Sequence, residues 1–238
     1  MERVAEGVEL LRLRPPSRPQ RLTNIYFLAD DGGVVVYETG SAGAAKDIRR
    51  AASERGGIKR IVLSHAHADH RGGAAHLDAP ILCHPAERPG AEGDGWEAQG
   101  FDYSKVRNPL VRAIAPRVLR NMDGGPLEIA GELGDGDTVA GFEVLHLPGH
   151  TPGLIGLWRS SDRVAIVSDA VFVFDPLSTL GLPGRVRLPP PAVRPDDEAA
   201  RESLRRIAAL DPATLWLGHY GPVKGDVRRQ LEEASAGP

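Results

Sequence analysis

A short stretch of the chain concentrates side chains that can bind metal ions. Three of the eight histidines and one aspartate fall within six positions, in the segment His65-Ala66-His67-Ala68-Asp69-His70. The apolar residues Ile61-Val62-Leu63 directly before it predict a short buried strand, so the segment is expected to lie at the edge of a sheet, where functional sites are common. Imidazole nitrogen and carboxylate oxygen are ligands that zinc and iron use in proteins.

The spacing of these residues favours two metal ions over one. Residues two apart in an extended chain point to the same side, so His65 and His67 can converge on one point. Asp69 and His70 lie just beyond and can serve a second point. The alternative is that the imidazoles are solvated loop side chains, and the clustering of three of eight histidines directly after a predicted buried strand argues against it.

The same segment resembles the signature of the metallo-β-lactamase fold hydrolases, in which a His-x-His-x-Asp-His sequence is followed by glycines, here Gly72-Gly73. Three later motifs extend the resemblance over about residues 20–225. In chain order, they are Gly149-His150-Thr151, Ser168-Asp169 after an apolar run, and Gly218-His219. Each later motif is weak by itself, but the combination of four in this order is specific.

Two residues depart from the family's pattern. Ser168 stands where glycine usually precedes the aspartate, and Glu38 begins a Glu-Thr-Gly sequence where Asp-Thr-Gly is usual. The family's aspartate is a structural hydrogen-bonding residue near the metals, and glutamate adds one methylene group. Glu38 is therefore expected either to hydrogen-bond a metal ligand or to have a plain loop role.

The resemblance implies seven ligands for two divalent metal ions. His65, His67 and His150 would bind one ion; Asp69, His70 and His219 would bind the other; Asp169 would bridge the two. This set has nitrogen and oxygen donors and no thiolate, which suits Zn²⁺ and is compatible with Fe or Mn.

Such a pair of ions implies hydrolysis without a protein nucleophile. Metal-bound water has its pKa lowered to about 7, so a hydroxide can attack the substrate carbonyl. Asp69 is the side chain assigned to catalysis in addition to metal binding. Ser64 and Cys83 then have plain expected roles, as a polar loop residue and a small buried apolar residue.

The resemblance points to hydrolysis of a carboxylic ester, lactone or thioester, as in the glyoxalase II-like and lactonase branches. The chain ends soon after His219, without the helical extension with which glyoxalase II holds glutathione, which argues against hydroxyacylglutathione itself. The alternatives are an iron-dependent dioxygenase of the same fold, a β-lactamase or a phosphodiesterase. The bridging Asp169 and the lack of a secretion signal disfavour a β-lactamase, and the complete ligand set disfavours a non-enzymatic binding protein.

The apolar pattern around these motifs predicts an α/β fold. Residues 44–55 are predicted to form a helix between strands at 34–37 and 60–63, so these strands are expected to be parallel. Asp196 is expected to cap a second long helix that ends at Leu210. Further strands are predicted at 8–14, 22–29, 80–83, 127–129, 142–147, 154–158, 163–167 and 215–217, and further helices at 72–77 and 225–234.

Together with the resemblance, this pattern predicts one domain over residues 1–238. The expected architecture is a four-layer αβ/βα sandwich of the metallo-β-lactamase type, with two mixed sheets flanked by helices. Residues 175–195 contain six prolines and are expected to form a meandering surface loop.

Residues 86–125 are predicted to form an insertion beside the site. Its first half is acidic, from Glu87 to Asp102, whereas the span from Ser104 to Asn121 contains five basic residues and no acid. An apolar stripe at four-residue spacing predicts a helix that prolines interrupt or kink. The stripe is Val106, Leu110, Ile114 and Val118, and the prolines are Pro109 and Pro116.

Two interpretations of this insertion remain open. One is a solvated pair of surface helices, in which the acidic half neutralises the basic half. The other is a lid over the metals, since long insertions beside a site are often functional. In the second case, Arg107 and Arg112 would bind a carboxylate or phosphate group of an anionic small-molecule substrate.

Composition limits the remaining function classes. The net charge of −3 gives no reason to expect a nucleic-acid partner. Cys83 is the only cysteine, so no internal disulfide can form. The first residues lack the apolar core of a signal peptide, and no apolar run could span a membrane. A cytoplasmic protein that acts on a small molecule, without a membrane partner, is expected, and its oligomeric state is left open.

Overall fold

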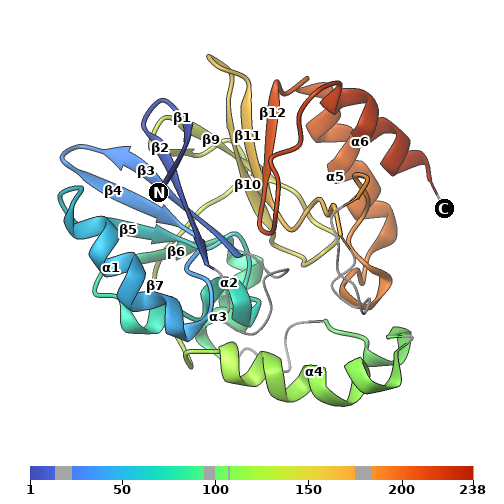
Figure 1. Ribbon diagram of the computed structural model, residues 1–238, viewed down its shortest axis with the longest axis horizontal. Helices are drawn as coiled ribbons and strands as arrows, with labels where there is room; N and C mark the ends of the chain where they lie inside the picture. Colours follow the sequence, from blue (N-terminus) through green and yellow to red (C-terminus); the bar gives the residue numbers. More distant parts are fainter. Residues whose placement is uncertain (14–22, 94–99, 107, 175–183, 238) are drawn as a thin grey trace.

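The computed structural model describes residues 1–13, 23–93, 100–106, 108–174 and 184–237. Two mixed sheets face each other, with α1 on the outer side of one sheet and α5 and α6 on the outer side of the other (Figure 1). This arrangement confirms the predicted fold class, an α/β sandwich of two mixed sheets flanked by helices.

The first sheet contains seven strands in the order of the chain. They are β1 (Glu2–Ala5), β2 (Val8–Leu13), β3 (Thr23–Asp30), β4 (Gly33–Tyr37), β5 (Ile58–Val62), β6 (Ile81–Cys83) and β7 (Ile129–Glu132). Strands β1 to β4 are antiparallel, whereas β5, β6 and β7 join β4 in parallel. The parallel pairing of β4 and β5 is the one predicted for a strand–helix–strand unit.

The second sheet contains five strands in the order β12-β11-β10-β9-β8. They are β8 (Thr138–Val139), β9 (Phe142–His146), β10 (Ile155–Arg159), β11 (Val164–Ser168) and β12 (Thr214–Leu217). Only β11 and β12 are parallel among these pairs. Their carboxyl ends therefore point to the same edge of the sheet.

Alternation along the strands produces the layers. In β4, Val35 and Tyr37 belong to the apolar cluster between the two sheets, which also contains Ile166 of β11. Val34 and Val36 point to the other face and pack with Ile48 of α1 (Ala45–Ser53). Both faces of the strand are buried, which explains its unbroken run of apolar residues.

The second helical layer covers the outer face of the second sheet. It consists of α5 (Asp197–Ala209) and α6 (Val227–Ala236), and Leu204 of α5 and Leu231 of α6 share an apolar cluster with Val167 of β11. The predicted cap of α5 is present, because the Asp196 carboxylate accepts a hydrogen bond of 2.9 Å from the Ala199 N–H.

The described residues of the insertion and its start form short 3₁₀ turns at Pro85–Glu87 and Tyr103–Lys105 and the helices α3 (Arg88–Glu92) and α4 (Pro109–Met122). Helix α4 runs through Pro116 without a break, so of the two predicted effects of the prolines the interruption was wrong, and the kink stays a prediction. Pro109 occupies the first turn, where its missing N–H costs no helical bond.

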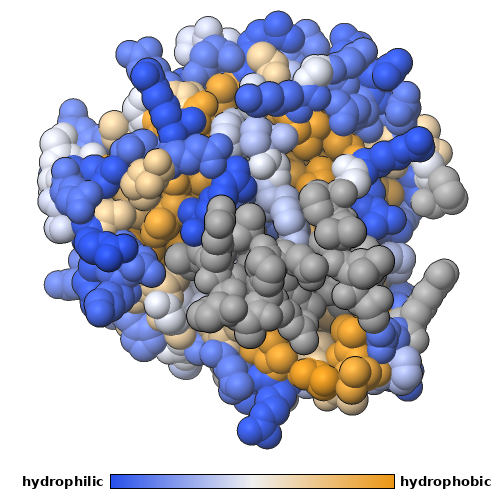
Figure 2. Space-filling model, viewed as in Figure 1, coloured by the Kyte–Doolittle hydropathy of each residue, from blue (hydrophilic) through white to orange (hydrophobic). Residues whose placement is uncertain are grey.

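The apolar stripe of α4 is not packed as the sequence suggested. Among the stripe residues, Val106 is buried, but Leu110 is 66% exposed and Ile114 is 40% exposed. Figure 2 shows the resulting apolar surface at the lower edge of the molecule, where Figure 1 places α4.

Two other predictions needed correction. The helix expected at 72–77 begins earlier, as α2 (Ala68–Arg71), and is followed by a 3₁₀ turn at Ala74–His76. The segment 184–195 is not simply a surface loop: Leu188, Pro189 and Pro190 are buried, and a 3₁₀ turn follows at Pro191–Val193. The rest of the predicted loop, 175–183, lies outside the described residues.

None of the helices in the part of the chain that the structure describes combines the length and the apolar character needed to cross a bilayer.

Candidate metal centre

The seven predicted ligands come from segments that follow strands of both sheets. His65 and His67 follow β5, and Asp69 and His70 lie in α2. Three further side chains come from the second half of the chain: His150 after β9, Asp169 directly after β11, and His219 after β12. The site therefore lies where the edges of the two sheets meet.

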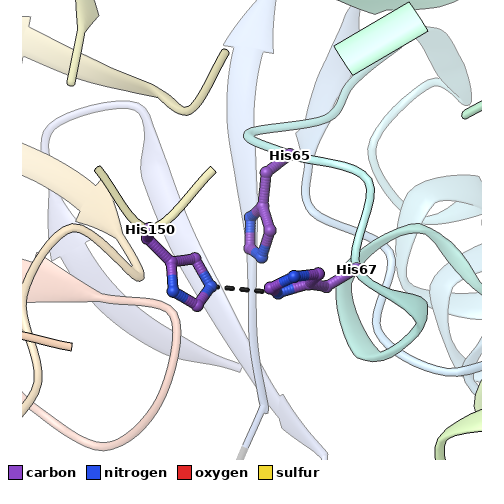
Figure 3. Close-up of side chains that lie close together, drawn as sticks. All are labelled: His65, His67 and His150. Carbon is purple, nitrogen blue, oxygen red and sulfur yellow. Dashed lines mark hydrogen bonds between the residues drawn. The ribbon is translucent and has the colours of Figure 1, made fainter. Parts of the chain in front are cut away.

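The first group of ligands consists of three imidazoles. Ligand atoms of His65, His67 and His150 lie within 4.8 Å of one another. Figure 3 shows the three rings converging, His65 and His67 from one loop and His150 from another, with Nε2 of His150 3.0 Å from Nδ1 of His67.

The proton positions in this group leave nitrogen lone pairs facing the centre. Nδ1–H of His150 donates a hydrogen bond of 2.7 Å to the carbonyl oxygen of Val193, so Nε2 keeps its lone pair. Nε2 of His65 is buried without a hydrogen-bond partner among the described residues. A buried imidazole nitrogen without a partner is costly, and a metal ion would satisfy it. The residues present therefore fit a metal ion.

The second group contains a carboxylate and two imidazoles. Ligand atoms of Asp69, His70 and His219 also lie within 4.8 Å of one another. Nε2 of His219 lies 3.3 Å from Oδ2 of Asp69 and 3.2 Å from Nε2 of His70. These atoms face each other, as the donors around one cation would.

Asp169 lies between the two groups. Its Oδ2 is 3.4 Å from Nε2 of His70, 3.5 Å from Nε2 of His219 and 3.8 Å from Nε2 of His150. One carboxylate thus approaches ligand atoms of both groups. This position is compatible with the bridging role that the resemblance implies.

Gly218 leaves the space that Asp169 occupies. A Cβ atom at position 218 would overlap Oδ1 of Asp169 and lie 2.8 Å from Cε1 of His70. No larger residue fits without moving a candidate ligand. The glycine in the Gly-His motif is therefore required by packing rather than by backbone conformation.

A buried chain of hydrogen bonds connects the two groups. Ser168 Oγ donates to Oε1 of Glu38 at 2.9 Å, and Nδ1 of His70 lies 3.1 Å from Oε2 of the same carboxylate. On the other side, Ser64 Oγ donates to Ser168 Oγ at 2.9 Å and lies 2.7 Å from Nδ1 of His65. Since the hydroxyl hydrogen of Ser64 is used, Nδ1–H of His65 must be the donor in that contact.

This chain determines which imidazole nitrogens are available to metals. It keeps protons on Nδ1 of His65 and His70 and leaves both Nε2 atoms free to bind. Glu38 therefore hydrogen-bonds a candidate ligand, the first of its two expected roles. Ser64, expected to be a plain polar loop residue, is instead fully buried and part of the chain.

Glu87 joins the two loops that carry the first group, and the sequence analysis missed it. The residue is only 4% exposed, and its carboxylate accepts hydrogen bonds of 2.8 Å from the N–H groups of both Ala66 and Gly153. A single sequence gave no signal for this role, because the partners are backbone groups far apart in the chain.

Charge in the second group favours a cation. Burial opposes protonation of both imidazoles. The Asp169 carboxylate nevertheless raises the pKa of His219 to about 9. The carboxylates of Asp169, Glu38 and Asp69 together raise the pKa of His70 well above its usual range. In the first group, burial lowers the pKa of His150 to about 3. Without metal, the protons on His70 and His219 supply the positive charge that the carboxylates require.

Aromatic rings border the centre on one side. The ring centroid of Phe172 lies 5.8 Å from that of His150, and the ring centroid of Phe174 lies 5.6 Å from that of His219. Both phenylalanines are buried. These rings limit access of water to that side of the ligands.

Of the two predicted substrate-binding arginines, only Arg112 is described, and the structure shows no contact between it and the candidate ligands. Arg112 is exposed on α4, and its side chain makes no hydrogen bond or ion pair with the residues that the structure describes. Arg107 lies outside the described residues. Their role in binding an anionic substrate stays a prediction.

Comparisons with known proteins identify the family. The family model "Metallo-beta-lactamase superfamily" matches residues 18–219. The chain is 30% identical over 234 residues to the probable metallo-hydrolase YflN of Bacillus subtilis (strain 168), covering 90% of this chain and 86% of that protein. The protein belongs to the metallo-β-lactamase superfamily, whose members bind metal ions and are mostly hydrolases.

Two further similarities bear on activity and fold. A hydroxyacylglutathione hydrolase of Bdellovibrio bacteriovorus is 29% identical over 196 residues, which cover 80% of this chain and 60% of that protein. A metallo-beta-lactamase family protein from Thermus thermophilus has a crystal structure that matches with a TM-score of 0.67 and 26% identity, over 98% of this chain and 79% of that chain.

Proposed function

We propose that this protein hydrolyses a carboxylic ester, lactone or thioester with the help of two divalent cations. Zn²⁺ is the proposed metal, and the ligand set is also compatible with Fe or Mn. The observation that carries the proposal is the position of Asp169, whose Oδ2 lies 3.4–3.8 Å from imidazole nitrogens of both ligand groups. A single-metal site would need no carboxylate at this position. The similarity to a hydroxyacylglutathione hydrolase supports a thioester among the three substrate classes.

The chain's own residues would hold and orient the reacting groups. His65, His67 and His150 would hold one cation, and Asp69, His70 and His219 the other. When bound, such cations lower the pKa of water to about 7 and polarise a carbonyl oxygen. Asp69 remains ionised, because His70 and His219 lower its pKa although burial opposes this, so its carboxylate can accept a proton from water.

Metal content and oxygen dependence test this function. Protein reconstituted with zinc should contain two ions per chain and should hydrolyse an ester, lactone or thioester from a small panel under anaerobic conditions. A single tightly held ion per chain would remove the dinuclear mechanism. Oxygen uptake by the iron-loaded protein, with no turnover of any panel member by the zinc-loaded protein, would replace hydrolysis with dioxygenase chemistry.

A further inference from the structure

A cavity separate from the metal centre lies against the C-terminal helix. Its volume is about 650 Å³, and it lies between α6 and the segment 185–191. None of the seven candidate ligands lines it. Its size falls within the range of about 300–1,000 Å³ that is typical of small-molecule sites.

The wall of this cavity is rich in arginine. Its charged residues are Arg185, Arg187, Arg194, Arg229 and Glu233. Two of the arginines have acidic partners: Arg194 is 2.6 Å from Asp197, and Arg229 is 3.5 Å from Glu233. The side chains of Arg185 and Arg187 make no hydrogen bond or ion pair with any described residue, so the described part of the chain leaves these two positive charges uncompensated.

The backbone fixes the direction of these two arginines. Val186 between them packs against the apolar cluster of the second sheet, and Leu188 after them is buried in it. Arg187 also exchanges two backbone hydrogen bonds with Phe172, of 2.9 and 3.0 Å. Arg185 and Arg187 are both exposed and both line the cavity, so their side chains lie on the side away from the core.

We propose that this cavity binds a phosphate group carried by a small soluble molecule. Guanidinium groups bind phosphate oxygens through paired N–H donors, and a phosphate dianion can satisfy two of them at once. A single carboxylate carries one charge and would leave one arginine uncompensated. Two like charges at one cavity wall repel each other, and a bound dianion removes this cost.

The cavity and the metal centre share one segment of the chain. Arg187 pairs with Phe172, whose ring faces His150, and Val193 in the same segment accepts the Nδ1–H hydrogen bond of His150. A ligand in the cavity therefore contacts the segment that orients a candidate metal ligand. The binding site itself does not depend on the reaction proposed above.

Calorimetry with inorganic pyrophosphate tests the proposal. Metal-loaded wild-type protein should bind it in a saturable way, and the double variant Arg185→Gln/Arg187→Gln should bind it at least about tenfold more weakly, because both uncompensated charges are lost. Arg228→Gln is the matched control, since Arg228 lies on α6 next to Arg229, is not part of the cavity wall and pairs with Glu232 at 3.0 Å. Circular dichroism would check that each variant is folded.

Any one of the following results would overturn the proposal. Equal pyrophosphate affinity in the wild type and the double variant would place the anion elsewhere, including at the metals. Succinate binding as tightly as pyrophosphate would make the ligand a dicarboxylate. Tighter binding of a short single-stranded oligonucleotide than of pyrophosphate would replace the small molecule with nucleic acid, and no saturable binding at millimolar concentration would remove the site.

Discussion

Ser168 donates a hydrogen bond of 2.9 Å to Glu38, and both residues stand where the sequence resemblance led us to expect other types, glycine and aspartate. The longer side chain of glutamate allows one carboxylate to contact both His70 and Ser168. Ser168 has a φ of 46°, a left-handed conformation that glycine adopts at less cost. The two departures therefore support each other: the hydroxyl binds the carboxylate, and this bond offsets backbone strain at Ser168.

We expect Ser168→Gly and Glu38→Asp to be energetically coupled. Each single variant breaks the buried hydrogen-bond chain, so adding the second substitution should cost little further stability. The free energy of unfolding of the double variant should fall by less than the sum of the single effects, with a coupling of about 0.5–3 kcal/mol. Denaturant unfolding of the metal-loaded protein measures it, and additive effects would show that the two residues act independently.

Replacing Asp169 with alanine should disrupt the proposed metal pair. Two cations would lose the only carboxylate among the seven candidate ligands that approaches both groups. We expect loss of the more weakly held ion and a fall in hydrolysis of at least about a hundredfold. Elemental analysis and steady-state kinetics measure both, with the exposed Asp137→Ala as control. Wild-type metal content and rate in Asp169→Ala would refute the bridging role.

Glu87→Gln should weaken metal binding from outside the ligand set. The amide keeps the shape of the side chain but points a donor at one of the two N–H groups that the carboxylate now binds. Zinc affinity, measured by competition with a chelator, should fall about 10–100-fold. Glu92→Gln is the matched control, because Glu92 pairs with Arg88 at the surface of α3. An unchanged zinc affinity in Glu87→Gln would mean that the two loops hold their positions without it.

A single methyl group at position 218 should disrupt the proposed metal pair. In Gly218→Ala the new Cβ overlaps Asp169, so the carboxylate must move. Elemental analysis should find less than two metals per chain. Gly43→Ala provides the comparison, since a Cβ at position 43 meets nothing within 4 Å. Equal metal content in the two variants would contradict the packing argument.

Cys83 should be inert in the folded protein. Burial, followed by the nearby Glu87 carboxylate, raises the pKa of its thiol to about 12. At pH 8, roughly four units below this value, only about one molecule in ten thousand carries the reactive thiolate. A colorimetric thiol reagent should therefore label Cys83 only after unfolding. Rapid labelling of the native protein at pH 8 would show that the strand carrying Cys83 opens readily.

The sequence by itself determined the layers and the order of the site motifs. Buried strands such as β4 are recognisable in the sequence because residues on both faces are apolar. Helix α5 is recognisable because Asp196 stands at its cap and its residues form one apolar face. These signals are local, so a single chain carries them. The family resemblance was recognisable for the same reason, because each motif follows a strand and consists of only a few consecutive residues.

Only the tertiary structure decided how the ligands are held. The partners of Ser168 and Glu87 come from segments 21 to 130 positions away, and no local pattern encodes such contacts. The exposed face of α4 likewise could not be predicted, because an apolar stripe shows that a helix can be buried but not whether another element covers it. Burial and long-range pairing depend on how the two sheets meet, and that geometry exists only in the folded chain.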